Sequence, residues 1–307
     1  MTNSNDKFKF VKIDEFASEH ISAPHYSYWK SVFKHFFKSK LAIAMLIMAA
    51  IIFAVAMIQP LFSHYNPMAS PDISNFAIRF NQPSLANWFG TDHWGNSLFD
   101  AVWAGARTSI TIALLATTIN MVLGISVGAI WGYNKALDKY LLEIYNVVAN
   151  VPFLLVAIML MYVLGPGFWQ LIFVLCMTEW LSIAFFIRTQ VMIIRDREYN
   201  LVSKTLGTSS GRMIFRNILP FLTSVIVTLL SREIPSIIST EAFLSYLGVG
   251  LPPQITSLGK LISIYITYYG TYPYLFWIPV IVLASISVSF YIVGQTFADA
   301  SDPKTHR

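Results

Sequence analysis

Charged residues are scarce in this chain of 307 residues. Asp, Glu, Lys and Arg together make up 12% of the sequence, whereas a soluble domain carries about a quarter. Hydrophobic residues make up 55%, and the mean hydropathy is +0.58. This shortage of charge excludes an ordinary soluble domain and predicts an integral membrane protein. The pI near 9.2 does not indicate a nucleic-acid partner, because the basic residues lie beside apolar runs, as membrane topology requires.

Groups that carry catalysis or bind metals are also missing. The single cysteine, Cys176, excludes a disulfide framework, and none of the six histidines belongs to an H-E-x-x-H pair or a Cys/His cluster. Gly259-Lys260 lacks the other residues of a phosphate-binding loop, and no G-x-S-x-G motif occurs. We therefore expect no catalytic, metal or cofactor site on this chain. A transport protein whose energy is supplied by another subunit fits these absences best.

Six apolar runs are long enough to cross a bilayer, and they predict an all-α membrane protein. They cover residues 41–58, 108–133, 140–164, 168–187, 218–240 and 274–297. Pro60 is expected to end the first run. Gly124, Gly128 and Gly132 recur at four-residue spacing in the second, which favours close approach of another helix over a pore-lining role.

The orientation follows from the placement of lysine and arginine. With the N-terminus in the cytoplasm, seventeen of these residues fall in cytoplasmic segments and two, Arg79 and Lys260, fall outside. This predicts a multi-pass protein of the cell membrane with both termini in the cytoplasm. The predicted segments are a cytoplasmic N-terminal segment (1–40), a first transmembrane helix (41–60), an extracellular loop (61–104), a core of five transmembrane helices (105–298) and a cytoplasmic tail (299–307).

The N-terminal segment becomes basic and aromatic before the first span. Trp29, Phe33, Phe36 and Phe37 have helical spacing, with lysines between them. This pattern predicts a helix that lies in the headgroup region, in preference to a solvated tail. The two long outer loops, 61–104 and 244–273, are expected to form an external cap. This cap binds a partner protein, seals the bundle, or does both.

The longest polar and basic interval between two apolar blocks covers residues 195–220. Tyr199, Val202 and Leu206 share one helical face within it, Gly207 interrupts the helix, and Leu219-Pro220 begins the next apolar run. The orientation places this interval in the cytoplasm. A short amphipathic helix there either rests on lipid headgroups or docks on a partner protein.

Three charged residues fall within or near the spans: Glu179, Arg232 and Glu233. An unpaired charge in a bilayer costs at least about 2.5 kcal/mol, so these groups either face a water-filled cavity or form an internal salt bridge. Glu241, near the end of the fifth span, is a fourth candidate for a substrate pathway. Loss of uptake on replacing Arg232 and Glu233 by alanine would distinguish the two interpretations.

The interval 195–220 resembles the EAA loop of permease subunits in ABC importers. Gly207 is followed after eleven intervening residues by Leu219-Pro220, and the wider pattern is similar to the dipeptide and oligopeptide branch. The positions of the family's Glu-Ala-Ala are occupied here by Leu201-Val202-Ser203. Further stretches with the same resemblance are Tyr28-Trp29 to Ala42, Gly90 to Gly95 with Gly105 to Ser109, Glu241 to Gly250 with Pro252-Pro253, and Gly294 with Asp299-Ala300 and Asp302-Pro303. Their order resembles the C-type permease of an oligopeptide importer of the Ami-like group.

This resemblance implies the type I ABC importer permease fold and a heteromeric complex. The implied partners are a second, similar permease, two cytoplasmic subunits that bind ATP and Mg²⁺, and an extracellular protein that delivers peptide. A coupling helix at about residues 197–211 docks on one ATPase in that arrangement. The residues that the resemblance assigns to coupling are Glu198, Tyr199, Val202, Leu206, Gly207 and Arg212.

Other functions remain open from the residues alone. A dipeptide or nickel importer is the near alternative, although no His or Cys cluster favours a metal. A secondary transporter driven by an ion gradient is a different class, and such carriers often contain inverted repeats that this sequence does not display. A membrane-embedded enzyme is disfavoured by the missing catalytic groups.

Overall fold

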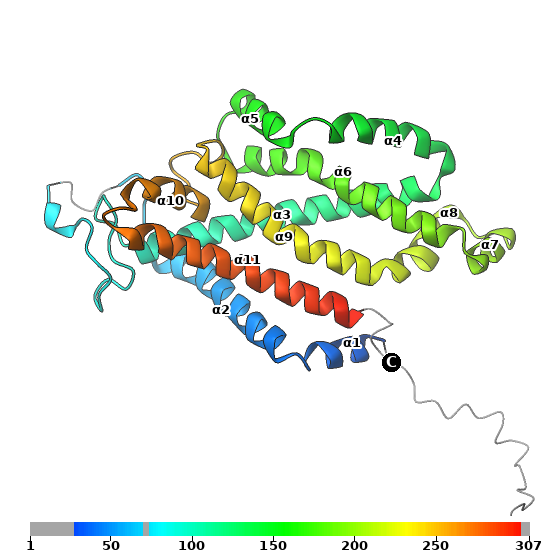
Figure 1. Cartoon of the computed structure of the whole chain (residues 1–307), viewed down its shortest axis with the longest axis horizontal. Helices are drawn as coiled ribbons and strands as arrows, with labels where there is room; N and C mark the ends of the chain where they lie inside the picture. The colour runs from blue at the N-terminus through cyan, green and yellow to red at the C-terminus, as the bar shows by residue number, and fades with distance from the viewer. Residues whose placement is uncertain (1–27, 70–73, 302–307) are drawn as a thin grey trace, which may run out of the picture.

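The computed structural model describes residues 28–69 and 74–301. The predicted features at 1–27, 70–73 and 302–307 lie outside the described residues; they include His20, His25, His306 and Asp302-Pro303. The described chain is a bundle of long helices, with a short helix, α7, at one end and another, α10, at the other (Figure 1). We call these the α7 end and the α10 end.

Five helices are long and apolar enough to cross a membrane: α2 (Lys40–Phe62), α3 (Leu98–Tyr133), α6 (Phe168–Arg195), the run Ser210–Tyr246 and α11 (Pro273–Ser301). The run Ser210–Tyr246 comprises α8 (Ser210–Arg212), the π-helix η3 (Met213–Ile218), the 3₁₀ turn η4 (Leu219–Leu222) and α9 (Thr223–Tyr246). A sixth span results if the bent pair α4 (Lys135–Ala149) and α5 (Phe153–Leu164) counts as one. The number of predicted spans is thus consistent with the structure.

The third span was predicted as one continuous helix over 140–164, and this is wrong. α4 and α5 are bent by 79° at a break formed by residues 150–152. Pro152 has no N–H for the helix ladder, and its ring pushes Val151 away from the helical region. The apolar composition continues through the break, so hydropathy alone did not reveal it.

Several predicted boundaries also differ. α3 begins at Leu98, ten residues before the predicted start of its span, because Ser97 caps it by accepting a hydrogen bond from the Asp100 N–H. Pro60 does not end the first span but lies inside α2, which continues to Phe62. A proline so close to the end of a helix removes only one backbone hydrogen bond.

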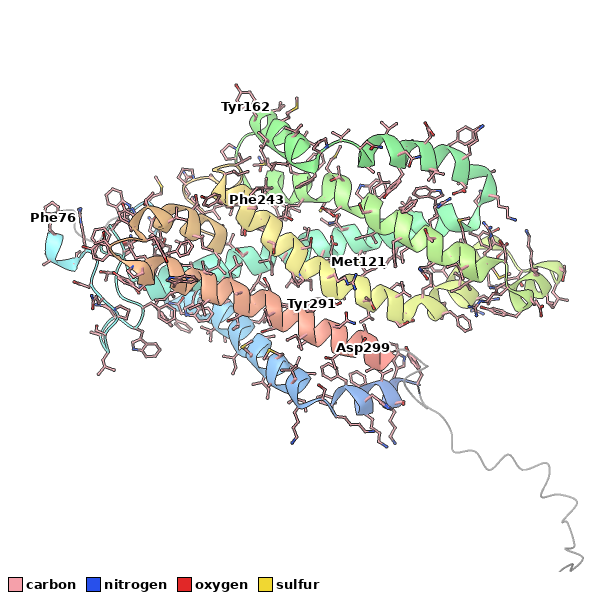
Figure 2. All side chains as sticks on the ribbon, in the orientation of Figure 1. Phe76, Met121, Tyr162, Phe243, Tyr291 and Asp299 are labelled. Carbon is pink, nitrogen blue, oxygen red and sulfur yellow. The ribbon has the colours of Figure 1, made fainter. Side chains whose placement is uncertain are left out.

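The glycine repeat of α3 packs against α6, as the sequence predicted. A Cβ atom on Gly124 would lie 2.6 Å from Ile183, one on Gly128 2.4 Å from the Ala184 carbonyl oxygen, and one on Gly132 2.6 Å from the Arg188 carbonyl oxygen. Contacts of this length are impossible for a real side chain, so the backbones of α3 and α6 approach each other through these glycines. Met121, labelled in Figure 2, lies on α3 in the middle of the bundle.

The predicted N-terminal helix is present as α1 (Tyr28–Phe36), although its faces differ from the prediction. Trp29, Phe33 and Phe37 are about half exposed, whereas Phe36 is buried against the end of α11. The Tyr28 hydroxyl donates a hydrogen bond to the Ser301 carbonyl at 2.7 Å. α1 and the end of α11 therefore lie together, on the same side of the molecule as α7 (Figure 1).

The described part of the α10 end is built from residues 63–69 and 74–97 of a first loop and from a second loop, 247–272, which contains α10 (Leu258–Tyr265). The first loop closes on Asp92, which is 3% exposed and whose Oδ1 accepts hydrogen bonds from the N–H groups of Trp94 and Asn96. The Tyr265 hydroxyl of α10 donates to the Asp92 Oδ2 atom at 3.3 Å. The two loops thus form one folded cap, as the sequence predicted, while the helix α10 within it was not predicted.

Candidate functional site

α7 (Glu198–Thr205) is the helical part of the interval that the sequence singled out. Its attachment depends on Asn200, which is 2% exposed and whose Nδ2 donates a hydrogen bond to the Ile194 carbonyl at the end of α6. The predicted helix at about 197–211 is wrong in length, because α7 ends at Thr205 and α8 begins only at Ser210. Arg212, predicted on the same helix, lies on α8.

Gly207 ends α7 through a specific backbone geometry. Its φ is 84°, and its N–H donates to the Lys204 carbonyl while the Thr208 N–H donates to the Ser203 carbonyl. This pair of hydrogen bonds is a Schellman motif, which requires the left-handed conformation that glycine adopts without strain. The Schellman motif therefore explains why a glycine occupies position 207.

The predicted coupling residues form an exposed surface on α7. Glu198, Val202 and Leu206 are spaced by four residues on one side of the helix, and the exposed fractions of Val202 and Leu206 are 57% and 80%. Tyr199 is 41% exposed, and its ring centroid lies 5.7 Å from that of Phe221. Leucine and valine exposed on a short helix beside a folded bundle are typical of a contact surface for another molecule.

The segment after α7 holds this surface firmly on the bundle. Met213, Ile218 and Leu222 are buried with Ile187 and Val191 of α6 in one hydrophobic cluster. η3 is a π-helix, a distortion that often marks functional sites. No pattern in the sequence predicts the π-helix, because its composition is that of an ordinary α-helix.

A second polar anchor joins α4 to α6 near the α7 end. Arg188 pairs with Asp138 through its Nε and Nη2 atoms, and the Trp131 indole N–H donates to the same carboxylate at 2.8 Å. The Arg188 guanidinium also lies over the Trp131 ring, 5.2 Å from its centroid. These residues form an internal support, which explains why a charged pair is tolerated beside an apolar helix.

The intramembrane charges do not form the internal salt bridge that was one of the two interpretations. Among residues 28–69 and 74–301, the ion pairs are Arg188–Asp138 and Arg195–Asp196. Glu233 instead accepts a hydrogen bond at 2.9 Å from Asn120 of α3, and Glu179 lies on α6. Both carboxylates are partly exposed, and Arg232 is exposed. α3 and α9 thus bring an amide and a carboxylate together inside the bundle.

Glu179 also lines a cavity of about 550 Å³ beside the break between α4 and α5. The other polar residues of its wall include Asn150, Thr178 and Ser182. A broken helix with polar groups at membrane depth is tolerated where it is buried in protein or lines a water-filled space.

Glu241 has a different environment from the other candidates. It is completely buried, and its two carboxylate oxygens accept hydrogen bonds from Ser109 of α3 at 2.9 Å and from Ser245 at 2.8 Å. Ser109 in turn accepts a hydrogen bond from the Leu258 N–H at the start of α10. Glu241 has no exposed surface in this structure and connects α3, α9 and α10.

Residues that could hold a metal are not grouped in the described part of the chain. No set of three or more His, Cys, Asp or Glu side chains has a suitable arrangement there. Cys176 is buried and unpaired.

Comparison with known proteins places the chain among membrane transport components. The family described as "Binding-protein-dependent transport system inner membrane component" matches residues 121–307, and "N-terminal TM domain of oligopeptide transport permease C" matches residues 27–83. The chain is 51% identical to the oligopeptide transport system permease protein AmiD of Streptococcus pneumoniae, over 100% of this chain and 99% of that protein. It is 34% identical to the oligopeptide transport system permease protein OppC of Bacillus subtilis, over 94% of each chain.

More distant relatives extend this comparison. The dipeptide transport system permease protein DppC of Bacillus subtilis is 31% identical over 94% of this chain and 90% of its own length. A solved structure of the MetNI methionine ABC transporter, in an inward-facing conformation, is similar with a TM-score of 0.53 and 16% identity, covering 66% of this chain and 96% of that chain. At that identity the similarity establishes the fold.

Proposed function

The chain belongs to the family of binding-protein-dependent transport system inner membrane components, and we propose that it is a permease subunit of an ATP-driven oligopeptide importer in the cell membrane. Similarity over the full length to an oligopeptide permease at 51% identity is the observation that carries this proposal. In this role the chain forms half of the translocation pathway, and a second, similar permease forms the other half. Both termini and α7 would lie in the cytoplasm, in line with the distribution of lysine and arginine.

α7 would couple this chain to one of two cytoplasmic ATPase subunits, which would bind the ATP and Mg²⁺. The exposed side chains of Val202 and Leu206 would occupy an apolar groove of that subunit, with Glu198 and Arg212 at its rim. Because Asn200 and the buried cluster beneath η3 fix α7 to α6, movement of the ATPase would be transmitted to the bundle as a rigid-body rotation. An extracellular peptide-binding protein would land on the cap at the α10 end.

Reconstitution tests this function directly. The chain in proteoliposomes with the second permease, both ATPases and the binding protein should accumulate labelled peptide when ATP is supplied, and the chain alone should accumulate none. Uptake by the chain alone under a proton or sodium gradient would contradict the proposal and favour an ion-coupled carrier.

Dipeptide import is a second candidate, supported by the dipeptide permease relatives at 31% identity. The same proteoliposomes distinguish the two functions if unlabelled peptides of two to eight residues compete for uptake. Competition by long peptides is expected for an oligopeptide importer, and competition restricted to dipeptides would favour the alternative.

For the pathway we propose Glu179 and Glu233, with Arg232 beside them. Partly exposed carboxylates inside a membrane bundle are tolerated where they face water or another subunit, and a passing peptide carries an ammonium group that they would attract. Glu179→Gln and Glu233→Gln should each lower uptake by about tenfold, which corresponds to about 1.4 kcal/mol for one charge-assisted contact. Glu143→Gln, on the exposed side of α4, is the control. Unchanged uptake in both variants, with normal assembly, would remove these residues from the pathway.

A further inference from the structure

A groove with a volume of about 780 Å³ lies at the α7 end of the bundle. Its walls are the last turns of α3, the start of α4, one side of α7 and the segment α8–η3. Neither the proposed pathway nor the proposed docking surface uses it. The groove has an apolar part and a charged part, which come from different elements.

The apolar part follows α3. Ile125, Ala129 and Tyr133 lie four residues apart and therefore line one side of the helix. They span about two turns, about 12 Å, which is close to the depth of one leaflet of the hydrocarbon core, about 15 Å. Met213 and Leu219 close the opposite side. An acyl chain that runs along α3 would match both the length and the polarity of this part.

The charged part lies where the chain leaves the bundle. Three basic residues line it, Lys135, Arg195 and Lys204, together with one acidic residue, Asp196. Arg195 is already engaged, because its guanidinium pairs with Asp196 and donates a hydrogen bond to the Gly132 carbonyl at 2.7 Å. Because the charges of Arg195 and Asp196 cancel, the two lysines give the groove a net positive charge.

The two lysines converge although they come from different helices. Lys135 opens α4 and Lys204 is in the last turn of α7, yet both act on Asp196 and, after the hydrogen bond from Arg195, help to lower its pKa. Lys135 also stands at the N-terminus of a helix of 15 residues, where the macrodipole already favours an anion.

We propose that this groove binds an anionic phospholipid, with its headgroup phosphate between Lys135 and Lys204 and an acyl chain along Ile125, Ala129 and Tyr133. The positive charge selects an anionic headgroup over a zwitterionic one. The apolar wall selects a lipid over a free phosphate, which would leave that wall uncovered. Asn200, Leu201 and Lys204 line the groove, whereas Val202 and Leu206 do not, so the lipid occupies one side of α7 and leaves the other side free.

The test measures lipid bound to the full chain. The purified chain, delipidated in mild detergent, is mixed with dioleoyl-phosphatidylglycerol or dioleoyl-phosphatidylcholine, and bound lipid is counted by native mass spectrometry. We expect a preference for phosphatidylglycerol that falls by roughly 25-fold in the variant K135A/K204A, the fold-change that corresponds to about 1 kcal/mol per lysine. K139A/R197A removes the same charge from exposed residues that do not line the groove, and its preference should be unchanged.

A second variant tests the apolar part without altering charge. Ile130 lines the groove and is 53% exposed, so Ile130→Trp should fill part of the space, keep the fold and lower retention of phosphatidylglycerol. Glycerol phosphate, which has the charge and no acyl chain, should not displace the lipid at equal concentration.

Four results would overturn the proposal. The first is equal retention of the two lipids, and the second is an equal loss of lipid preference in K135A/K204A and K139A/R197A. The third is displacement of the bound lipid by glycerol phosphate as effectively as by lipid. The fourth is loss of the bound lipid when the chain is assembled with its partner subunits. The last result would mean that another protein fills the groove. The lipid measurement is made on the chain alone, so it is independent of whether the importer function is correct.

Discussion

The two ends of the bundle differ in their buried polar contacts, although both expose apolar side chains, such as Phe76 at the α10 end, which is 74% exposed. At the α10 end, Glu241, Asp92 and Ser257 are buried and hydrogen-bonded within the chain. At the α7 end, Leu206 is 80% exposed and Phe215 is 72% exposed. Figure 2 shows the two ends along the long axis, with Phe76 at the α10 end and Asp299 toward the other.

The buried polar network therefore distinguishes the α10 end from the α7 end. Polar groups that are satisfied internally are stable without a partner, so the hydrogen bonds of Glu241, Asp92 and Ser257 hold the α10 end together within the chain. Apolar groups left in water gain free energy when another surface covers them, at about 25 cal/mol per Å². By our two proposals, a partner protein would cover one side of α7 and a lipid the other, and each would add stability at the α7 end. The following predictions test this contrast, from the largest expected effect to the smallest.

The largest effect is expected from removing a carboxylate at each end. Glu241→Ala deletes the acceptor of two buried serine hydroxyls and should lower the free energy of unfolding by about 3 kcal/mol. Glu198→Ala removes an exposed carboxylate and should change it by less than about 0.5 kcal/mol. Chemical denaturation of both variants in mild detergent measures the difference. If Glu241→Ala were no more destabilising than Glu198→Ala, the cap would not depend on this network.

Glycines at the two ends provide a second contrast. A Cβ atom on Gly259 would lie 2.3 Å from the Ala242 Cα atom, so Gly259→Ala must push α10 away from α9 and should cost about 2 kcal/mol. Gly207 has open space around its Cα atom, so Gly207→Ala meets only the strain of a positive φ, about 1 kcal/mol. Gly211 has open space and no positive φ, which makes Gly211→Ala the control with little change.

Thermal unfolding of the three glycine variants ranks them by their loss of stability. The expected loss of stability is greatest for Gly259→Ala and smallest for Gly211→Ala. A larger loss for Gly207→Ala than for Gly259→Ala would mean that the α7 end is packed more tightly than its exposure indicates.

The smallest effect concerns pH at the α10 end. Burial lowers the pKa of His93. The Asp92 carboxylate raises this pKa and the Arg79 guanidinium lowers it, and the net shift is downward. The imidazole of His93 in the unfolded chain has a pKa of about 6.5. Below that pH the unfolded chain binds a proton that the folded cap does not, so acid weakens the cap until the folded pKa is reached.

Hydrogen exchange of the cap measures this dependence. Amides of residues 91–97 and of α10 should exchange faster at pH 5.5 than the intrinsic pH dependence allows, and His93→Gln should remove most of the excess. The amides of α7 are the internal control. Acid protection of the cap, or an equal change in α7, would contradict the assignment to His93.

Much of this architecture could be predicted from the sequence because membrane proteins obey strong compositional rules. Apolar runs located the spans, Gly124, Gly128 and Gly132 predicted a close helix contact, and Gly207 marked the end of α7. Each of these signals is local: it depends on residues within one helix or one turn.

The features that escaped prediction depend on residues distant in the chain. Glu241 could not be assigned to the cap because its partner Ser109 lies on α3, although its other partner, Ser245, is one turn away on α9. The break between α4 and α5 escaped because hydropathy continues through it, although Pro152 was a visible signal. The groove at the α7 end is formed by segments from α3 to η3, so no motif in the sequence announces it.

The central claim is that the exposed face of α7 docks on a partner ATPase, and site-directed crosslinking tests it most directly. Cys176 is the chain's single cysteine, so a Cys176→Ser background accepts single cysteines at Val202, Leu206 and Leu201. Leu201 is 48% exposed, close to the 57% of Val202, but it lines the groove. We predict that cysteines at 202 and 206 crosslink to a co-purified ATPase in an ATP-dependent manner and that the cysteine at 201 does not. Crosslinking of all three positions to lipid alone, or of 201 as efficiently as 202, would contradict the account.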